Sequence, residues 1–355
     1  MEIRMRTITW NDKQKCLQVI DQTALPAEFR VLDLRSSKDV EQAIFSMVIR
    51  GAPAIGIAAA FGLAIAALEI TTSDPGEFKQ ELTKAGNRLI RVRPTANSIS
   101  VAINYLESQI DHFTGSPDEI RELLIKSAQA MAEQDVQINQ AIAEHGAGLI
   151  NDGDHIVHHC NTGSLAAVDY GTALGCIRRA HEQGKHIHVY VDESRPLLQG
   201  ARLTAWELGQ YGIPYDIIVD SSAGLLIRSG LVQKVMFGAD RVAANGDVVN
   251  KVGSYMLSLA ALDNGIPAFS VFPTSAIDYN YSNGDAIKIE QRDPSEVLDI
   301  QFHGTRATPL NATALNYAFD ITPHRLLSGL VTEKGVFYPP FSRELTLQRH
   351  AKGSS

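Results

Sequence analysis

The sequence predicts an α/β protein in which a mostly helical N-terminal domain precedes a doubly wound, Rossmann-like domain with a parallel sheet. One observation is a series of long helical patterns that ends near His145. Another is that, after Gly146, short apolar runs alternate with helical stretches. Such apolar strands are covered on both faces, and their alternation with helices is typical of a parallel sheet. The expected domains are therefore residues 1–145 and 146–355.

The N-terminal domain is expected to begin with two short strands, at residues 16–22 and 29–34. The helical patterns that follow cover residues 38–49, 53–70, 74–91, 98–113 and 117–145. The last pattern is long and has apolar residues at spacings of three and four. We expect this helix to bridge the two domains.

Residues 51–68 carry no charge and just reach the length of a membrane span. They are rich in alanine and glycine and include Pro53, so a helix buried inside a domain is expected instead. Residues 1–16 lack the continuous apolar core of a signal peptide. The three cysteines are too few for a disulfide framework, which favours a reducing, cytoplasmic location without membrane attachment.

The second domain is expected to contain strands joined by helices. Strand-like runs occupy residues 155–159, 187–192, 216–220, 234–238, 267–272 and 317–321, and helical patterns occupy residues 165–182, 199–211, 222–228 and 253–264. Ligands of open parallel sheets bind beyond the carboxyl ends of the strands, near the switch in strand order. The loops after the first, second and fourth strands, at residues 160–164, 192–196 and 238–241, are therefore expected to converge.

Several classes of function are disfavoured. The formal net charge of −8 argues against a general nucleic-acid binder. No G-x-G-x-x-G follows a strand and no Walker A sequence occurs, so neither a dinucleotide nor a P-loop nucleotide site is expected. Neither a C-x-x-C nor an H-E-x-x-H spacing occurs, so the sequence does not predict a metal site. A small anionic substrate remains compatible with the charge, because a few Arg and Lys side chains hold one phosphate.

Cys160 is the first candidate for chemistry because it follows a strand and precedes a predicted helix. The dipole at a helix N-terminus lowers the pKa of a nearby thiol. The alternative is a small buried hydrophobe, and we interpret Cys16 and Cys176 in that way. A Cys–His hydrolase dyad is disfavoured, because His158 lies roughly 6–7 Å along the strand and His159 points to the opposite face. A distant histidine would still serve as a base.

Asp240 ends the run KVMFGAD at the ligand edge of the predicted sheet. An aspartate in this position is either an N-cap or, if partly desolvated, a general acid or base.

Other polar residues fit an anionic sugar. Asn250 and Lys251 precede an apolar helix, which is typical of an anion site but also of a plain polar loop. Gln199 opens another helical pattern and would reach a sugar hydroxyl. The stretches RGAPAIG and RVRPTAN each set an arginine before a proline, which suits a first helical turn. These arginines would hold one phosphate, or form only surface salt bridges.

These stretches together resemble a known family. RGAPAIG, RPTAN, HCNTGSLA, SRPLLQGARLTAWEL, GADRVAANGDVVNKVGSYMLSLAA and FDITP are similar to sequences of the 5-methylthioribose-1-phosphate isomerases of methionine salvage. Those enzymes share the fold of the translation initiation factor 2B alpha, beta and delta subunits. The resemblance runs from about Thr7 to Pro340, and Ser164, where alanine is expected, affects no catalytic position.

The resemblance implies a homodimeric aldose–ketose isomerase that uses no cofactor and converts 5-methylthioribose 1-phosphate to 5-methylthioribulose 1-phosphate. It implies Cys160 and Asp240 as the catalytic pair. Asp240 would supply the acid for ring opening, and Cys160 the base or electrostatic partner for hydrogen transfer from C2 to C1. The implied substrate contacts are Arg50, Gly51, Ala52, Arg93, Gln199, Asn250 and Lys251.

Two alternatives remain open on this fold. One is an isomerase of another phosphosugar, such as ribose 1,5-bisphosphate, whose second phosphate would need its own cationic site. The other is a regulatory subunit that binds a sugar phosphate or nucleotide without catalysis. A pure binder has no need for a thiol and a carboxylate at adjacent strand ends.

Overall fold

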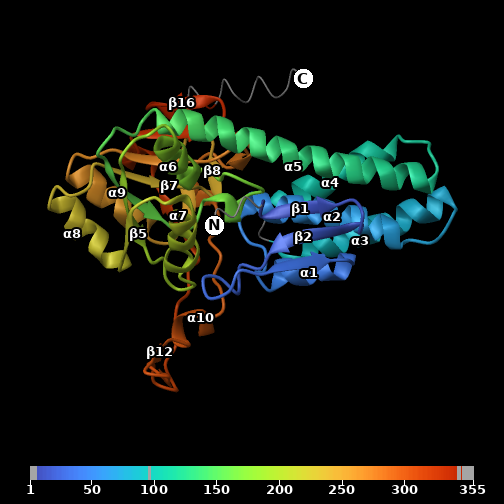
Figure 1. Ribbon diagram of the computed structural model, residues 1–355, viewed down its shortest axis with the longest axis horizontal. Coiled ribbons are helices and arrows are strands. Elements are labelled where there is room, and N and C mark those ends of the chain that lie inside the picture. The colour runs from blue at the N-terminus through green and yellow to red at the C-terminus, as the bar shows by residue number, and fades with distance from the viewer. Residues whose placement is uncertain (1–5, 95–96, 342–344, 346–355) are drawn as a thin grey trace. The chain divides into compact units, whose positions relative to one another are not determined.

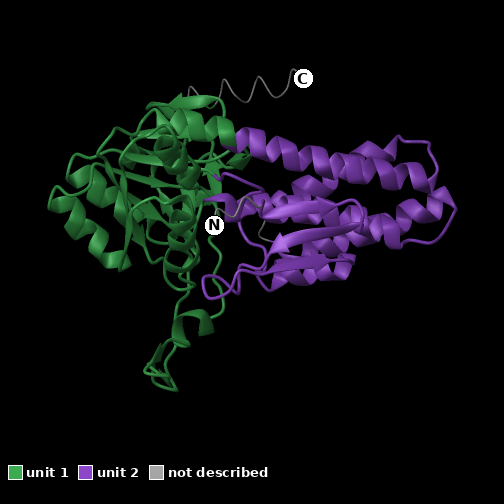
Figure 2. Ribbon diagram, viewed as in Figure 1, with its two compact units in different colours: residues 1–2, 140–162, 172–355 green, residues 3–139, 163–171 purple. Residues whose placement is uncertain are grey.

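The computed structural model describes residues 6–94, 97–341 and 345 (Figure 1). The chain forms two compact units (Figure 2). The C-terminal unit contains residues 140–162 and residues from 172 onwards, and the N-terminal unit contains residues up to 139 together with 163–171. This division differs from the contiguous domains expected from the sequence, because the chain returns to the N-terminal unit after residue 162.

The returning segment, residues 163–171, is held in the N-terminal unit by hydrogen bonds from the first part of the chain. The backbone N–H of Thr7 donates to the Val168 carbonyl at 3.0 Å, and the Thr7 hydroxyl donates to the Ser164 carbonyl at 2.7 Å. The Gln22 amide donates to the Leu165 carbonyl at 2.7 Å. These contacts join residues more than 140 positions apart in sequence, which explains why no local pattern indicates them.

The N-terminal unit combines a small antiparallel sheet with helices. Its elements are β1 (Ile8–Asn11), β2 (Cys16–Ile20), β3 (Val31–Leu34), α1 (Ser37–Phe45), α2 (Ala52–Glu69), α3 (Pro75–Val92), α4 (Asn97–Asp111) and the first part of α5 (Pro117–Ala147). The predicted helices are confirmed, although α1 ends earlier than expected. Strand β1 was not predicted because its four residues are too few to show an alternation.

Helix α2 is long and apolar enough to cross a membrane, but 78% of it is buried inside the structure. A helix that is apolar on every side is a core helix in a globular unit. The prediction of a buried helix at this position is confirmed.

The C-terminal unit is built on a sheet with the strand order β16-β15-β10-β7-β4-β5-β6, parallel except for β16. The strands are β4 (His155–His159), β5 (His188–Asp192), β6 (Tyr215–Ile218), β7 (Lys234–Phe237), β10 (Ala268–Val271), β15 (Gly329–Thr332) and β16 (Gly335–Phe337). Numbered along the chain, the six parallel strands follow the Rossmann order 3-2-1-4-5-6. The doubly wound fold is confirmed, and the order reverses between β4 and β7.

A second sheet, with the order β11-β8-β9-β14, corrects two predictions. It contains β8 (Arg241–Ala243), β9 (Val248–Lys251), β11 (Ile277–Asp278) and β14 (Phe319–Thr322). Residues 241–243 and 248–251 form strands on either side of a turn and not only a polar loop, and the run at 317–321 belongs to this sheet and not to the parallel one. The polar turn at residues 244–247 separates β8 from β9, and β11 has only two residues, so the local pattern does not indicate this sheet.

The remaining elements of the C-terminal unit connect these strands. They are α6 (Ala173–Glu182), a π-helical turn (Gly200–Thr204), α7 (Ala205–Tyr211), α8 (Ala223–Arg228), α9 (Ser254–Asp263), α10 (Ser295–Leu298), β12 (Gln301–Phe302), β13 (Thr305–Arg306) and the 3-10 turns Asp220–Ser222, Thr274–Ala276, Gly284–Ala286 and His324–Leu326. A further 3-10 turn, Ser164–Ala166, belongs to the returning segment of the N-terminal unit. The β12–β13 hairpin and α10 extend away from the sheets of this unit (Figure 1).

Candidate active site

The loops that carry Cys160 and Asp240 leave neighbouring strands at the switch in strand order. Cys160 directly follows β4, and Asp240 lies three residues after β7. In the sheet His159 pairs with Phe237. A Cβ atom on Gly238 would lie 2.7 Å from Cγ2 of Thr162, so the two loops pack against each other and only glycine fits there. The expected convergence of these two strand ends is therefore seen in the structure.

The backbone of Cys160 is held in a left-handed conformation, with φ of 64°. Its N–H donates to the Ser194 hydroxyl at 2.8 Å, and its carbonyl accepts from the Thr204 hydroxyl at 2.7 Å. A non-glycine residue with positive φ is strained and persists only where its surroundings hold it. These two buried hydroxyls provide that hold, so the thiol has a defined place at the end of β4.

The predicted helix at residues 165–182 is wrong in its first part. The chain makes a short 3-10 turn at Ser164–Ala166, and α6 begins only at Ala173. The reason is that Gly163 pairs with Gly171, which closes the returning segment into a loop. Because the α-helix starts thirteen residues after Cys160, the thiol does not lie at the N-terminus of this helix, contrary to the prediction.

The two histidines before Cys160 are engaged elsewhere. The pKa of His158 is lowered to about 3, because the ring is completely buried, so this imidazole is neutral. Its Nε2 pairs with the Thr162 hydroxyl at 2.9 Å. His159 bonds through Nδ1 to Asp192 at 2.8 Å and through Nε2 to the Val252 carbonyl at 2.9 Å. These contacts agree with the expectation that neither histidine is the base of a hydrolase dyad.

Asn250 and Lys251 end β9 and are both buried. The Lys251 ammonium donates to the Ala318 carbonyl at 2.8 Å. Burial lowers the pKa of Lys251, while negative charge on Cys160 and on Asp240 opposes that effect. Lys251 therefore lies close enough to both groups to interact with their charge, and the structure brings the predicted catalytic pair and this cation together.

Asp240 differs from these neighbours because it is exposed to solvent. Its backbone N–H donates to the Val249 carbonyl at 2.9 Å, which ties the β7 loop to β9. The desolvation that would suit this carboxyl for acid catalysis is not provided by the packing around it.

Gln199 directly precedes the π-helical turn and is only 7% exposed. Among the described residues its Oε1 has no hydrogen-bond partner. A Cβ atom on the next residue, Gly200, would lie 1.7 Å from the Asp192 carbonyl oxygen, so only glycine lets the chain approach the end of β5 this closely. A buried, unsatisfied amide oxygen at this edge of the sheet is suited to a ligand hydroxyl.

The remaining predicted contacts lie in the N-terminal unit. Arg50 is buried, and Arg93 caps the end of α3. Gly51 has φ of 94°, and a Cβ atom there would lie 2.5 Å from the Ala166 carbonyl oxygen of the returning segment. Ala52 begins α2, with Pro53 in its first turn as predicted. Their convergence with residues of the C-terminal unit remains a prediction, and Thr95 and Ala96 of the RPTAN motif are outside the described residues.

The residues that support the site were not predicted from the sequence. Asn161 donates to Thr204 at 3.2 Å and to the buried Glu207 at 2.7 Å. Asp320 accepts from the backbone N–H groups of Gly253 at 2.7 Å and of Tyr255 at 3.2 Å, and so caps the start of α9. The only sequence signal for these residues is a polar side chain next to an apolar strand, which is also the signal of an ordinary loop.

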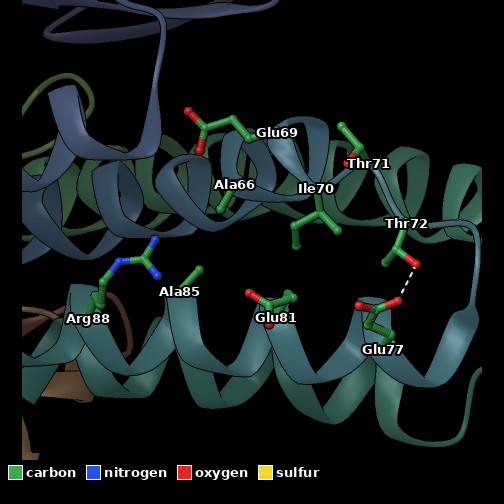
Figure 3. Close-up of a pocket in the computed structure, with 9 residues that line it drawn as sticks. All are labelled: Ala66, Glu69, Ile70, Thr71, Thr72, Glu77, Glu81, Ala85 and Arg88. Atoms are coloured by element: carbon green, nitrogen blue, oxygen red, sulfur yellow. Dashed lines mark hydrogen bonds between the residues drawn. The ribbon is translucent and has the colours of Figure 1, made fainter.

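Two cavities among the described residues each lie within one of the two units. Neither is lined by both a thiol and a carboxylate. One, of about 330 Å³, lies between α2 and α3 (Figure 3) and is lined by Ala66, Glu69, Ile70, Thr71, Thr72, Glu77, Glu81, Ala85 and Arg88. Several of its polar groups are already paired, as in the 2.6 Å bond from Thr72 to Glu77. The other, of about 250 Å³, lies beside Val252, and its Arg195 donates to the carbonyls of Pro196 and Val297.

Residues 48–339 match the model of the Initiation factor 2 subunit family. The chain is 44% identical over 340 residues to methylthioribose-1-phosphate isomerase 2 of Pseudothermotoga lettingae, covering 96% of this chain and 97% of that protein. It is 45% identical over 341 residues to methylthioribose-1-phosphate isomerase of Geobacter metallireducens, with coverage of 96% and 97%.

Solved structures give the same picture. The crystal structure of 5-methylthioribose 1-phosphate isomerase from Pyrococcus horikoshii OT3 superposes with a TM-score of 0.91 at 39% identity, covering 98% of this chain and 97% of that one. The structure of translation initiation factor eIF-2B, subunit delta, from A. fulgidus superposes with a TM-score of 0.86 at 40% identity, covering 96% and 97%.

Proposed function

The chain belongs to the Initiation factor 2 subunit family, and we propose that within it the protein is a methylthioribose-1-phosphate isomerase. It converts the aldose 5-methylthioribose 1-phosphate to the ketose 5-methylthioribulose 1-phosphate in methionine salvage. The near-full-length identity to isomerases of this name supports the activity.

The observation that carries the chemistry is the meeting of Cys160, Asp240 and Lys251 at the strand switch. A thiol and a carboxylate leave adjacent strands, and a buried ammonium interacts with both. Binding alone does not require a thiol and a carboxylate side by side, whereas an isomerisation requires groups that move a proton and stabilise developing charge.

The reaction leaves the composition of the sugar unchanged. Asp240 donates a proton to the ring oxygen as the bond between that oxygen and C1 breaks. The hydrogen on C2 then moves to C1, the C2 hydroxyl returns a proton to the Asp240 carboxylate, and C2 becomes the ketone while C1 keeps its phosphate. We assign Cys160 to the hydrogen transfer. Because Asp240 is exposed, we assign its desolvation to the bound sugar itself.

Substrate binding is assigned to the cationic and amide groups already named. We propose that Arg50, Arg93 and Lys251 hold the phosphate, together with the backbone N–H groups at the start of α2. Gln199 and Asn250 are assigned to the sugar hydroxyls. The activity requires no cofactor in this scheme.

We also propose that the protein acts as a cytoplasmic homodimer. None of its three cysteines, all within the described residues, forms a disulfide, which suits a reducing compartment. Sedimentation of the purified protein tests the dimer.

Cys160→Ser and Asp240→Asn test the catalytic assignment. Each should lower kcat by about a hundredfold or more, because general acid–base groups contribute about 10²–10⁴-fold. Binding of the product, measured by calorimetry, should change far less. Cys16→Ser and Asp216→Asn are matched controls outside the site and should retain near-normal turnover. Near-normal turnover in either site variant would refute the assignment.

The A. fulgidus structure favours a second candidate, a regulatory subunit without catalysis, since its name is that of an initiation factor subunit. The two candidates differ in one measurement. A wild-type protein that binds methylthioribose 1-phosphate but does not turn it over would support the regulatory subunit and contradict the isomerase.

A further inference from the structure

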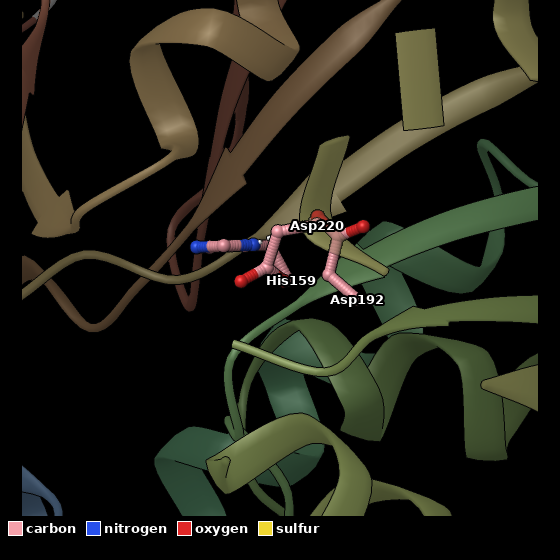
Figure 4. A group of neighbouring side chains, drawn as sticks. All are labelled: His159, Asp192 and Asp220. Atoms are coloured by element: carbon pink, nitrogen blue, oxygen red, sulfur yellow. Dashed lines mark hydrogen bonds and ion pairs between the residues drawn. The ribbon is translucent and has the colours of Figure 1, made fainter. Parts of the chain in front are cut away.

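A cluster next to Cys160, in which two of the three side chains are buried, has no role in the reaction described above. It contains His159 at the end of β4, Asp192 at the end of β5 and Asp220 after β6 (Figure 4). One potential ligand atom of each residue lies within 4.8 Å of the others, as in a metal site. The cluster belongs entirely to the C-terminal unit.

The hydrogen bonds of the cluster argue against a metal ion. The two carboxylate oxygens of Asp220 accept from the N–H groups of Ser194 at 2.7 Å and of Arg195 at 2.8 Å. Both nitrogens of His159 are also engaged. Of the ligand atoms in this cluster, only Oδ1 of Asp192 has no hydrogen-bond partner among the described residues. An incoming cation would find one open ligand atom, so we do not propose a metal.

The same bonds determine how many protons the His159–Asp192 pair holds. The Val252 carbonyl can only accept, so Nε2 of His159 must carry a hydrogen. The Nδ1–Asp192 bond of 2.8 Å contains a second hydrogen. The pair therefore holds one proton more than a neutral histidine beside an ionised aspartate. The side chains of His159 and Asp192 are 1% and 3% exposed, so no water replaces either bond.

The pair connects the two sides of the proposed active site. Cys160 follows His159 in the chain, and Ser194, which binds the Cys160 N–H, donates to the Asp192 carbonyl at 3.0 Å. On the other side, Val252 follows Lys251. Gly253 has φ of 110° and packs so closely that a Cβ atom there would lie 2.8 Å from the His159 ring.

We propose that His159 and Asp192 are positioning residues for the isomerisation. They clamp the turn after Lys251 to the end of β4 and so fix Lys251 relative to Cys160 while the pair keeps its proton. This role rests on the proposed isomerase function. Neither residue is assigned a contact with the substrate.

The charges around the pair set the pH range of the clamp. Three carboxylates face His159, those of Asp192, Asp220 and Asp320, while His158 and Lys251 are the basic groups nearby. Burial alone would lower the pKa of His159, but the bond to Asp192 and the negative charges together raise it. The raised pKa keeps the pair protonated, and the clamp closed, to a higher pH than an ordinary histidine would allow. When the proton leaves at alkaline pH, an unprotonated Nε2 faces the Val252 carbonyl and the bond is lost.

Asp192→Asn tests the proposal because it keeps the shape of the side chain and removes the charge that retains the proton. The wild-type kcat should fall on the alkaline side of its pH profile. In the variant this fall should move to lower pH by at least about one unit, since loss of a close carboxylate shifts a pKa by about 1–3 units. A merely structural role would lower kcat at every pH without moving the profile.

Asp154→Asn is the matched control. Asp154 forms a buried ion pair with Lys234 at the amino ends of β4 and β7. Cys160 lies at the opposite, carboxyl end of β4. This variant should lose stability but keep the wild-type pH profile of kcat. The same shift in both variants would overturn the proposal, as would an unchanged profile in Asp192→Asn.

Amide hydrogen exchange of the wild-type protein gives a test that needs no variant to fold. After correction for intrinsic rates, residues 250–256 should lose protection above the pH at which kcat falls, while residues 155–159 stay protected. Constant protection of residues 250–256 would refute the clamp. A wild-type protein inactive on methylthioribose 1-phosphate would instead refute the proposed function, and the exchange result would still show whether the clamp exists.

Discussion

The surroundings of Gln199 indicate that its side chain serves substrate binding and not the stability of the fold. A buried amide oxygen without a partner costs stability, on the order of 1–3 kcal/mol. A Gln199→Leu variant should therefore fold at least as stably as the wild type. It should also raise KM by roughly threefold to tenfold, because one hydrogen bond to the substrate is worth about 0.5–1.5 kcal/mol. Urea unfolding and steady-state kinetics measure the two effects.

Thr322→Val is the matched control for Gln199→Leu. The Thr322 hydroxyl is also buried without a partner among the described residues, but it lies in β14 and is not assigned to the substrate. Its loss should leave stability unchanged or higher and KM unchanged. A Gln199→Leu variant that loses stability while its KM stays normal would show that the side chain serves the fold.

Among the elements, α5 is coupled to the returning segment through a titrating group. Asp135 of α5 accepts from the backbone N–H of Val168 at 2.8 Å. Burial raises the pKa of Asp135 to about 6, and the Val168 bond only partly opposes that rise. An unfolded aspartate has a pKa near 3.9, so the folded chain binds the extra proton between about pH 4 and pH 6. Stability from this group is present below that window and falls as pH rises through it.

Asp135→Asn removes this titration and keeps an acceptor for Val168. We expect the free energy of unfolding of the variant, minus that of the wild type, to be larger at pH 7 than at pH 4. The increase should be on the order of 1–3 kcal/mol, since one pKa unit corresponds to about 1.4 kcal/mol. Urea unfolding at the two pH values measures the difference. Glu133→Gln, on the same helix but exposed, is the control. A stability difference that does not vary with pH would contradict the assignment.

Helices and strands with a clear apolar pattern could be predicted from the sequence. Short strands beside polar turns, and segments held by contacts with distant parts of the chain, could not. Helix α2 shows a continuous apolar run because it is buried on nearly every side, and the buried strands β4 and β7 each contain a short apolar run. Strands β8 and β9 lie on either side of the polar turn at residues 244–247, so the sequence there has the composition of a loop. The returning segment is defined by contacts with Thr7 and Gln22, which no local pattern contains.

The candidate site shows the same limit. Cys160 and Asp240 could be predicted, because topology brings the ends of neighbouring parallel strands together. The hold on Cys160 by Ser194 and Thr204 could not, since it depends on the positive φ that the chain adopts at residue 160. The link from His159 to Val252 was missed for a related reason: it joins a strand to a turn 93 residues later.

Taken over the whole molecule, the three cysteines occupy three different environments, and only one lies at the proposed site. Cys16 of β2 and Cys176 of α6 are 0% exposed, and Cys160 is 9% exposed. Burial raises the pKa of Cys16 and of Cys176, so neither forms the thiolate that reacts with disulfide reagents. Cys160 lies within the influence of the Lys251 ammonium, which favours negative charge on its sulfur.

The folded protein should therefore react with 5,5′-dithiobis(2-nitrobenzoate) at one thiol, and the unfolded protein at all three. Cys160→Ser should abolish the reaction of the folded protein, while Cys16→Ser should leave it unchanged. Lys251→Met should slow the reaction of Cys160, because it removes the cation that stabilises the thiolate. Saturating product should protect the same thiol. Reaction of more than one thiol in the native state, or native reactivity that persists in Cys160→Ser, would show that the reactive cysteine lies elsewhere than at the strand switch.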